Sequence, residues 1–366
     1  MNQPIRCYGC GAILQTDDQK KVGYIPQIKD NGKPLLCQRC FRLQHYHKLE
    51  KTSLQSDDFL KILQQISEKP GLIVYIIDLF DFNGSMLQGL TRHLPGKDIL
   101  VVANKRDLLP KLCNNTKITH WIYRHLKEYG IKPVDVLITS AKKNFQVETL
   151  MALIEKYRQQ QDVYVVGVTN AGKSTLINAL LKAFMQKEDL PLITTSEFPG
   201  TTLDLIAIEL DETHRLYDTP GIVNSHQLTL HVADRDLKAI VPQSEVKQQI
   251  YQLNDGQSLY VGGLARLDFL KGEKTSFAGF FSNRLKIHRC KLERADEIFT
   301  NDQVISPKAL NVKEIQDMAS YTFSIPEGKH DVVISGLGWF SLKGQHQKIR
   351  VYAPQEVGVF IRQSLV

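Results

Sequence analysis

The chain lacks the segments that a membrane or secreted protein needs. Its longest apolar run, GLIVYIIDLF at residues 71–80, is well short of the roughly 18 to 20 residues that span a bilayer. The start, MNQPIRCYGC, is too polar for a signal peptide, and six cysteines in a chain of 366 residues without a secretion signal argue against a disulfide framework. These absences predict a cytoplasmic protein with no membrane partner.

Four of the cysteines are grouped near the start of the chain. Cys7 and Cys10 form one C-x-x-C pair, and Cys37 and Cys40 form a second. Structural Zn²⁺ prefers a tetrahedron of soft ligands, and two such pairs supply the whole set. We therefore expect a zinc-knuckle domain at residues 1–52, the alternative being four reduced thiols.

Between residues 53 and 225 helical patterns alternate with buried strands. Four runs rich in β-branched residues have strand length, and the segments between them repeat their apolar residues at helical spacing. This alternation predicts an α/β domain with a mostly parallel sheet and helices on both faces. The four runs are LIVYIIDLF, DILVVANK, VDVLITSAK and DVYVVGVTN.

Residues 226–366 follow a different pattern. Several segments alternate apolar and polar residues and carry glycines, which predicts antiparallel strands in a mixed α+β, β-rich C-terminal domain. Helices are expected near residues 233–241 and 309–319. A net charge of +7 is compatible with a nucleic-acid partner, and two basic segments suit RNA, although solvated surfaces have a similar composition. They are residues 39–51 and a strand with Arg284, Lys286, His288, Arg289 and Lys291.

The stretch GVTNAGKST, residues 167–175, matches the phosphate-loop pattern G-x-x-x-x-G-K-S. It follows a predicted strand and opens a predicted helix, which is the context that the pattern requires. Its glycines let backbone N–H groups surround phosphates, Lys173 reaches the β- and γ-phosphates, and Ser174 binds Mg²⁺. The predicted contacts are Gly167, Asn170, Ala171, Gly172, Lys173, Ser174 and Thr175.

The tetrapeptide NKRD predicts that the bound base is guanine. The Asp107 carboxylate can accept hydrogen bonds from the ring N–H and the exocyclic amine of guanine, whereas adenine would leave it unpaired at a cost of about 1 to 3 kcal/mol. Asn104 would hold the loop together, and Lys105 would pack along the base. TSAKK contributes Ser140, Ala141 and Lys142. GTP and GDP are therefore the expected ligands.

Two motifs downstream of the phosphate loop complete the set. In DTPG, Asp218 can hold the Mg²⁺ shell and the Gly221 N–H can meet the γ-phosphate. In PGTT, either Thr201 or Thr202 should close over Mg²⁺ in the GTP state, and we favour Thr202. Lys173, Thr202 and Gly221 are thus the expected catalytic contacts.

These motifs occur in the order NKRD, TSAK, GVTNAGKS, PGTT and DTPG, which is the usual GTPase order cut after DTPG and rejoined. With the cysteine pairs before them and a β-rich tail behind, the chain resembles the circularly permuted ribosome-assembly GTPases of the YqeH type. The resemblance implies a role in maturing the small ribosomal subunit, with rRNA or ribosomal proteins as partners. We expect a monomer. An RNA-binding scaffold that uses GTP for stability, or a GTPase of RNA modification, remains an alternative.

Two residues near the phosphates predict unusual hydrolysis. Ile222 stands where many GTPases carry a glutamine that orients the attacking water, which predicts slow intrinsic turnover. Asn170 resembles the asparagine of potassium-activated relatives, in which K⁺ lies beside the phosphates. The alternative is an asparagine that only shapes the loop.

Overall fold

The computed structural model describes residues 5, 13–18, 23–27, 35, 37, 38, 56–185, 193–197, 204–301 and 305–366. These residues form two compact units. Within them, the first unit takes in the chain up to Asp78, Ser85–Arg106 and Thr119–Val223, and the second takes in Leu79–Gly84, Asp107–Ile118 and Asn224–Val366. No helix of the described segments is long and apolar enough to cross a membrane.

Most of the predicted zinc knuckle lies outside the described residues. This holds for Cys7, Cys10 and Cys40, and for the basic positions at 39–51. Cys37 is described and is fully buried.

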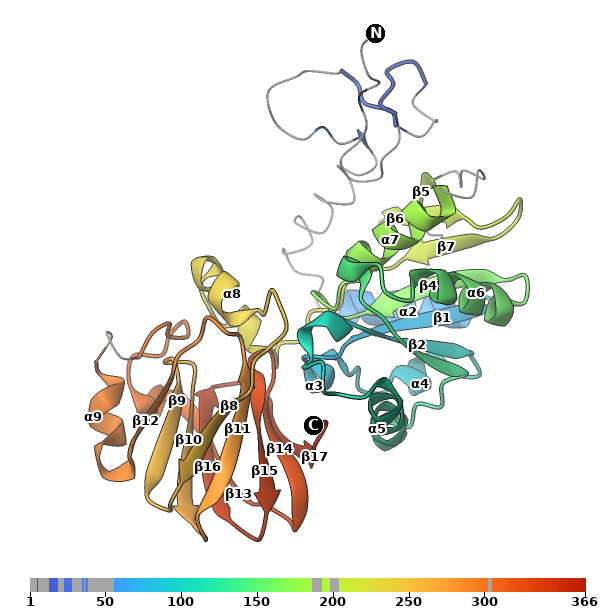
Figure 1. The fold of residues 1–366 in the computed structure, drawn as a ribbon. Helices are drawn as coiled ribbons and strands as arrows, with labels where there is room; N and C mark the ends of the chain where they lie inside the picture. The colour runs from blue at the N-terminus through green and yellow to red at the C-terminus, as the bar shows by residue number, and fades with distance from the viewer. Residues whose placement is uncertain are drawn as a thin grey trace. The chain divides into compact units, whose positions relative to one another are not determined.

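A seven-stranded sheet organises the first unit, in the order β3-β2-β1-β4-β7-β6-β5 (Figure 1). Strands β3, β2, β1, β4 and β7 run parallel to one another, and β6 and β5 are antiparallel additions beyond β7. Every residue of β1 and β2 is buried, so both faces of the sheet centre are covered, as predicted. The strands are β1 Gly71–Asp78, β2 Ile99–Asn104, β3 Asp135–Ile138, β4 Asp162–Gly167, β5 Ile193–Glu197, β6 Asp204–Glu209 and β7 Arg215–Asp218.

The predicted helices connect these strands. Helices α6 and α7 pack against each other and against β4, and α2 packs against α4. The bounds are α2 Ser56–Ser67, α3 Phe82–Ser85, α4 Leu90–His93, α5 Asn115–Glu128, α6 Val147–Arg158 and α7 Lys173–Met185, with short 3-10 turns η1 Arg106–Leu108 and η2 Ala141–Lys143.

Two five-stranded antiparallel sheets form most of the second unit, ordered β12-β9-β10-β16-β13 and β17-β14-β15-β11-β8 (Figure 1). Their inward residues, such as Phe269 and Phe340, share one hydrophobic core, so the β-rich prediction is confirmed. The strands are β8 Gln249–Leu253, β9 Gln257–Val261, β10 Ala265–Lys271, β11 Thr275–Phe281, β12 Ile287–Lys291, β13 Met318–Ser324, β14 Gly328–Ile334, β15 Gly338–Gly344, β16 Lys348–Pro354 and β17 Val359–Gln363.

One of the two helices predicted in this region is wrong. Helix α8, Asp234–Ile240, confirms the first. The second, expected near residues 309–319, is only the 3-10 turn η5, Ile315–Asp317. The backbone becomes extended at Met318, where β13 begins to pair with β16, so sheet pairing overrides the helical spacing. Other short elements are α9 Ala295–Phe299, η3 Leu228–Leu230 and η4 Leu292–Arg294.

Residues 79–84 follow β1 directly and belong to the second unit. The Phe80 ring packs against Trp339 with a centroid distance of 5.5 Å. The buried Asp81 carboxylate accepts a hydrogen bond of 2.7 Å from Gln227 Nε2 and one of 3.4 Å from the Ser335 hydroxyl. Residues 79–84 are therefore held by contacts within the second unit.

Candidate guanine-nucleotide site

The parallel sheet brings the sequence motifs to one edge. Asp78, Asn104, Ser140 and Gly167 lie at or just beyond the ends of β1, β2, β3 and β4, and Asp218 ends β7. Because neighbouring strands are parallel, these carboxyl ends face the same side. The strand order reverses between β1 and β4, and such a reversal is where α/β sheets usually bind ligands.

The phosphate loop leaves β4 and becomes helix α7 at Lys173. Asn170 and Gly172 have positive φ angles of 63° and 94°, and these conformations make the tight turn of the loop between β4 and α7. The Lys173 ammonium is almost fully buried and donates to the Gly167 carbonyl at 3.0 Å. The loop therefore curls around its own lysine, and this lysine and the loop N–H groups form a site that suits phosphate.

Asn104 joins three motifs. Its Nδ2 donates to the Ala171 carbonyl of the phosphate loop at 3.0 Å, and its Oδ1 accepts from the Ala141 N–H at 3.0 Å. A Cβ at Gly172 would come within 2.3 Å of the Asn104 Nδ2, so only glycine lets the two segments approach this closely. A guanine carbonyl at Ala141 would share that N–H with Asn104.

Lys105 has a partner that the sequence patterns did not indicate. Its Nζ lies 2.6 Å from Asp78 Oδ2, and the two side chains are 22% and 10% exposed. Lys105 adopts a left-handed φ of 67°, which directs the chain from β2 into the turn η1 that contains Asp107. The one available signal was a carboxylate at the end of a buried apolar strand, GLIVYIID.

The segment after β7 is hydrogen-bonded to the phosphate loop. Ile222 N donates to the Gly167 carbonyl at 3.2 Å, and Thr169 N donates to the Ile222 carbonyl at 2.8 Å. A Cβ at Gly221 would lie 2.8 Å from Lys173 Nζ and 3.0 Å from Thr169 Cγ2. This bridge was not predicted, because hydrogen bonds between loops leave no periodic trace in the sequence.

The other predicted residues are distributed as follows. Ser140 caps η2 and accepts from the Lys143 N–H at 3.2 Å. Lys142 and Thr175 are exposed, Ser174 is half-buried in the first turn of α7, and the Asp218 side chain is buried. Thr201 and Thr202 lie outside the described residues.

The donor set at this edge fits a magnesium nucleotide. Lys173 and the loop amides complement phosphate charge, and the Ser174 hydroxyl and the Asp218 carboxylate are hard oxygen ligands of the kind that Mg²⁺ prefers. The glycines at positions 172 and 221 leave space that a side chain would fill. The fold and the site thus define a P-loop GTPase with a permuted order of motifs.

Comparison with known proteins gives a narrower assignment. A family model described as "50S ribosome-binding GTPase" matches residues 162–259, and one described as "YqeH-like, C-terminal" matches residues 274–365. The protein YqeH of Bacillus subtilis is 45% identical over 367 residues, with 100% of both chains covered. The chain belongs to the YqeH family.

More distant relatives also align over most of the chain. NO-associated protein 1 of Arabidopsis thaliana is 29% identical, covering 98% of this chain and 76% of the relative. Nitric oxide-associated protein 1 of Homo sapiens is 22% identical, covering 99% of this chain and 75% of the relative.

Proposed function

We propose that this GTPase uses its nucleotide state to control binding to the assembling small ribosomal subunit in the cytoplasm. The observation that supports this is the path of the chain after DTPG. The first unit ends at Val223, and Asn224 begins the long final segment of the second. A change at Gly221 when the γ-phosphate is lost would therefore reach the second unit through covalent bonds.

In this proposal each motif has a distinct task during hydrolysis. Lys173 balances charge on the β- and γ-phosphate oxygens, and the Gly221 N–H donates to the γ-phosphate. Ser174, Thr202 and Asp218 would hold Mg²⁺, which when bound neutralises charge on the β- and γ-phosphates. Asp107 selects guanine through its carboxylate, and this contact with the base holds the nucleotide in place while the γ-phosphate reacts.

Slow turnover and activation by K⁺ are part of the proposal. The Ile222 side chain is a hydrocarbon that packs against the hydrophobic core of the first unit, and it has no group that could hydrogen-bond an attacking water. Asn170 is an exposed residue of the phosphate loop and would bind K⁺, which would supply the missing positive charge. Its left-handed φ of 63° also fits the simpler role of turning the loop.

We also propose a zinc site at Cys7, Cys10, Cys37 and Cys40. Two C-x-x-C pairs supply four thiolates, and the burial of Cys37 is consistent with a closed site. Metal analysis of freshly purified protein should find one zinc per chain, and Cys37→Ser should reduce it while GTP binding persists. Zinc-free wild-type protein would remove this part of the proposal.

The ribosomal partner is tested by sedimentation with purified subunits. The family model that covers residues 162–259 carries the name of the large subunit, whereas we propose the small one, so both must be included. Coupling energies of about 1 to 3 kcal/mol are usual, which predicts roughly 5- to 150-fold tighter binding with a non-hydrolysable GTP analogue than with GDP. Lys173→Ala should behave like the GDP form.

Each outcome of the sedimentation experiment selects a different function. Equal binding with both nucleotides would favour an RNA-binding scaffold in which GTP has a structural role. Nucleotide-dependent binding to the large subunit alone would keep the nucleotide control of binding and change the ribosomal partner. Absence from both subunits would end the ribosomal proposal.

A further inference from the structure

Asn283 holds the segment 245–247 at two points. Its Nδ2 donates to the Glu245 carbonyl at 2.8 Å, and its Oδ1 accepts from the Lys247 N–H at 2.8 Å. Both functional groups of this one amide thus bind the same segment, much as a neighbouring strand would.

The same segment binds the chain that follows the guanine-reading motif. Val246 N donates to the Leu108 carbonyl at 2.9 Å, and Lys111 N donates to Glu245 Oε1 at 2.8 Å. Leu108 and Val246 are 5% and 1% exposed, so water hardly competes for the bond between them. Leu108 is the residue directly after Asp107, so the segment 245–247 is hydrogen-bonded to the backbone next to the base-reading residue.

Asn283 also lines a basic hollow of about 510 Å³. Two exposed lysines offer charge for phosphates, the Gln249 amide offers a hydrogen-bonding group for a base edge, and the half-buried Ile287 offers an apolar surface for a base. Lys247 and Asn283 line the hollow and also take part in the hydrogen bonds of the segment 245–247. The hollow is lined by Lys247, Gln249, Asn283, Leu285, Lys286 and Ile287.

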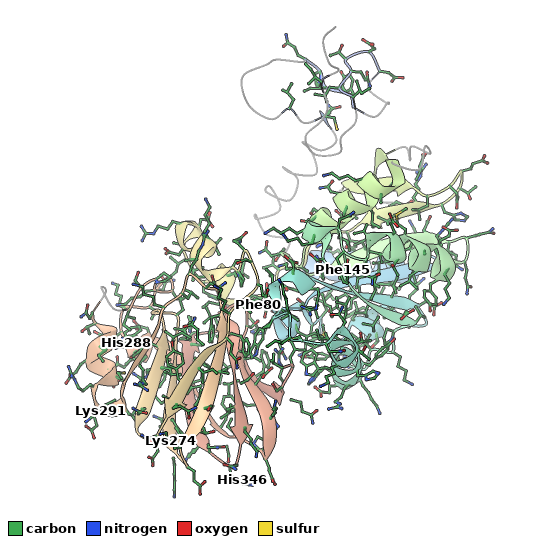
Figure 2. The ribbon with its side chains drawn as sticks, viewed as in Figure 1. Phe80, Phe145, Lys274, His288, Lys291 and His346 are labelled. Carbon is green, nitrogen blue, oxygen red and sulfur yellow. The ribbon has the colours of Figure 1, made fainter. Side chains whose placement is uncertain are left out.

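Further positive charge continues from the hollow along the edge strand β12. Arg289 and Lys291 on this strand are exposed, and Figure 2 labels His288 and Lys291 there. Two acidic residues flank this charge: Glu245, two residues before Lys247, directs its carboxylate to the Lys111 N–H, and the exposed Glu293 comes two residues after Lys291. The charge and the mixture of amide and aliphatic groups fit a single-stranded nucleic acid better than a lipid surface.

We propose that the hollow binds single-stranded RNA and that Asn283 is a positioning residue that links this site to guanine recognition by Asp107. The RNA part rests on the proposed ribosomal function. RNA held by Lys247 and Lys286 would fix the segment 245–247 and, through Leu108, the Asp107 carboxylate. Linkage is reciprocal, so guanine nucleotide should strengthen RNA binding by the factor by which RNA strengthens nucleotide binding.

The experiment uses the full chain, oligouridylate as the RNA, and GDP compared with inosine diphosphate. Inosine lacks the exocyclic amine that Asp107 would accept from, so the ratio of the two affinities reports the position of this carboxylate. Asn283→Ala should reduce that ratio by about 2- to 12-fold, the value of one hydrogen bond, and should weaken GDP and GTP equally. It should also abolish the linkage between RNA and GDP.

Matched variants separate the parts of the proposal. Asn254→Ala removes an exposed asparagine in the same unit and should change none of these values. Lys286→Ala should weaken oligouridylate binding and leave the GDP preference of RNA-free protein intact. Asn283→Asp keeps the acceptor for the Lys247 N–H, so it should fall between wild type and Asn283→Ala, and it serves if the alanine variant does not fold.

Three results would overturn the inference. An unchanged ratio of GDP to inosine diphosphate affinity in the Asn283 variants would show that the amide does not position Asp107. Equal oligouridylate binding by wild type and Lys286→Ala would place RNA elsewhere while leaving the ribosomal proposal standing. Binding to anionic vesicles without binding to oligouridylate would overturn both the RNA site and the RNA part of the proposed function.

Discussion

Asn104→Ala should destabilise the GTPase unit more than most single substitutions. The Asn104 side chain is 2% exposed and makes two hydrogen bonds of 3.0 Å, to the Ala171 carbonyl and from the Ala141 N–H. Ala171 and Ala141 are 1% and 8% exposed, so both groups would be left buried without this partner. Each unsatisfied group costs about 1 to 3 kcal/mol, giving roughly 2 to 6 kcal/mol in total.

The two tryptophans allow each unit to be followed separately. Trp121 lies in the first unit and Trp339 in the second. In a Trp339→Phe background, urea unfolding of nucleotide-free protein followed by fluorescence therefore reports the unit that contains Asn104. Asn104→Asp retains the acceptor for the Ala141 N–H but buries a carboxylate whose second oxygen faces the Ala171 carbonyl, so it should destabilise the unit at least as much as Asn104→Ala.

The control and the refuting result are both clear. Lys127→Ala truncates an exposed side chain of the first unit and should change the free energy of unfolding by less than about 0.5 kcal/mol. The same small change in Asn104→Ala would mean that the two bonds do not stabilise the unit in solution.

Three further predictions concern the nucleotide. Gly221→Ala should slow GTP hydrolysis roughly tenfold or more, equivalent to about 1.4 kcal/mol, because its Cβ would lie 2.8 Å from Lys173 Nζ; a wild-type rate in a single-turnover assay would contradict this. Asp107→Asn should weaken GTP and favour xanthosine triphosphate, because an amide can donate to the extra carbonyl of xanthine; unchanged competition between the two would mean that Asp107 does not read the base. Replacing Na⁺ by K⁺ should raise the rate of hydrolysis, and Asn170→Ala should remove most of the rise; equal rates in both salts would refute a role for K⁺.

Local sequence patterns were sufficient for β1, β2, β3 and β4 of the GTPase sheet but not for the antiparallel additions β5 and β6. The β-branched runs at β1 and β2 and the helical spacing in α6 and α7 are strong signals, because each element buries its own apolar residues. In the second unit the period of two indicated strands but not their partners. Strand β11, for example, pairs with β15 and β8, and nothing in a single strand specifies such a choice.

The missed parts of the site are contacts between segments that are distant in sequence. The Asp78–Lys105 pair joins residues 27 positions apart, and the bridge from Thr169 to Ile222 joins two irregular segments. Neither contact changes the periodicity of the residues around it. Asn104 was expected to hold its loop together. Its two specific partners could not be predicted, because they depend on the register of β2 beside β1 and β3.

The permuted order suggested one covalent route from the nucleotide to the C-terminal part of the chain, and the fold provides three. The second unit contains Leu79–Gly84, which follows Asp78, and Asp107–Ile118, which follows Arg106, as well as the segment from Asn224. The first segment follows β1, which ends at Asp78, the partner of Lys105. The second follows β2 and begins at Asp107 of the base-reading motif, and the third follows β7 and DTPG.

Two of these routes start at residues expected to sense the base and one at the residue expected to sense the γ-phosphate. GDP and GTP share the base, so the routes from β1 and β2 should respond to either nucleotide. Only the route from β7 should distinguish the two. A nucleotide can shift the second unit only by its differential affinity for two arrangements, so binding of any guanine nucleotide and loss of the γ-phosphate should act as separate signals. Hydrogen exchange would resolve them: the Val246 and Lys111 amides should be protected by GDP and GTP alike, whereas the Ile222 amide should differ between the two. If GTP protects all three amides and GDP protects none of them, only one route, the one that senses the γ-phosphate, operates.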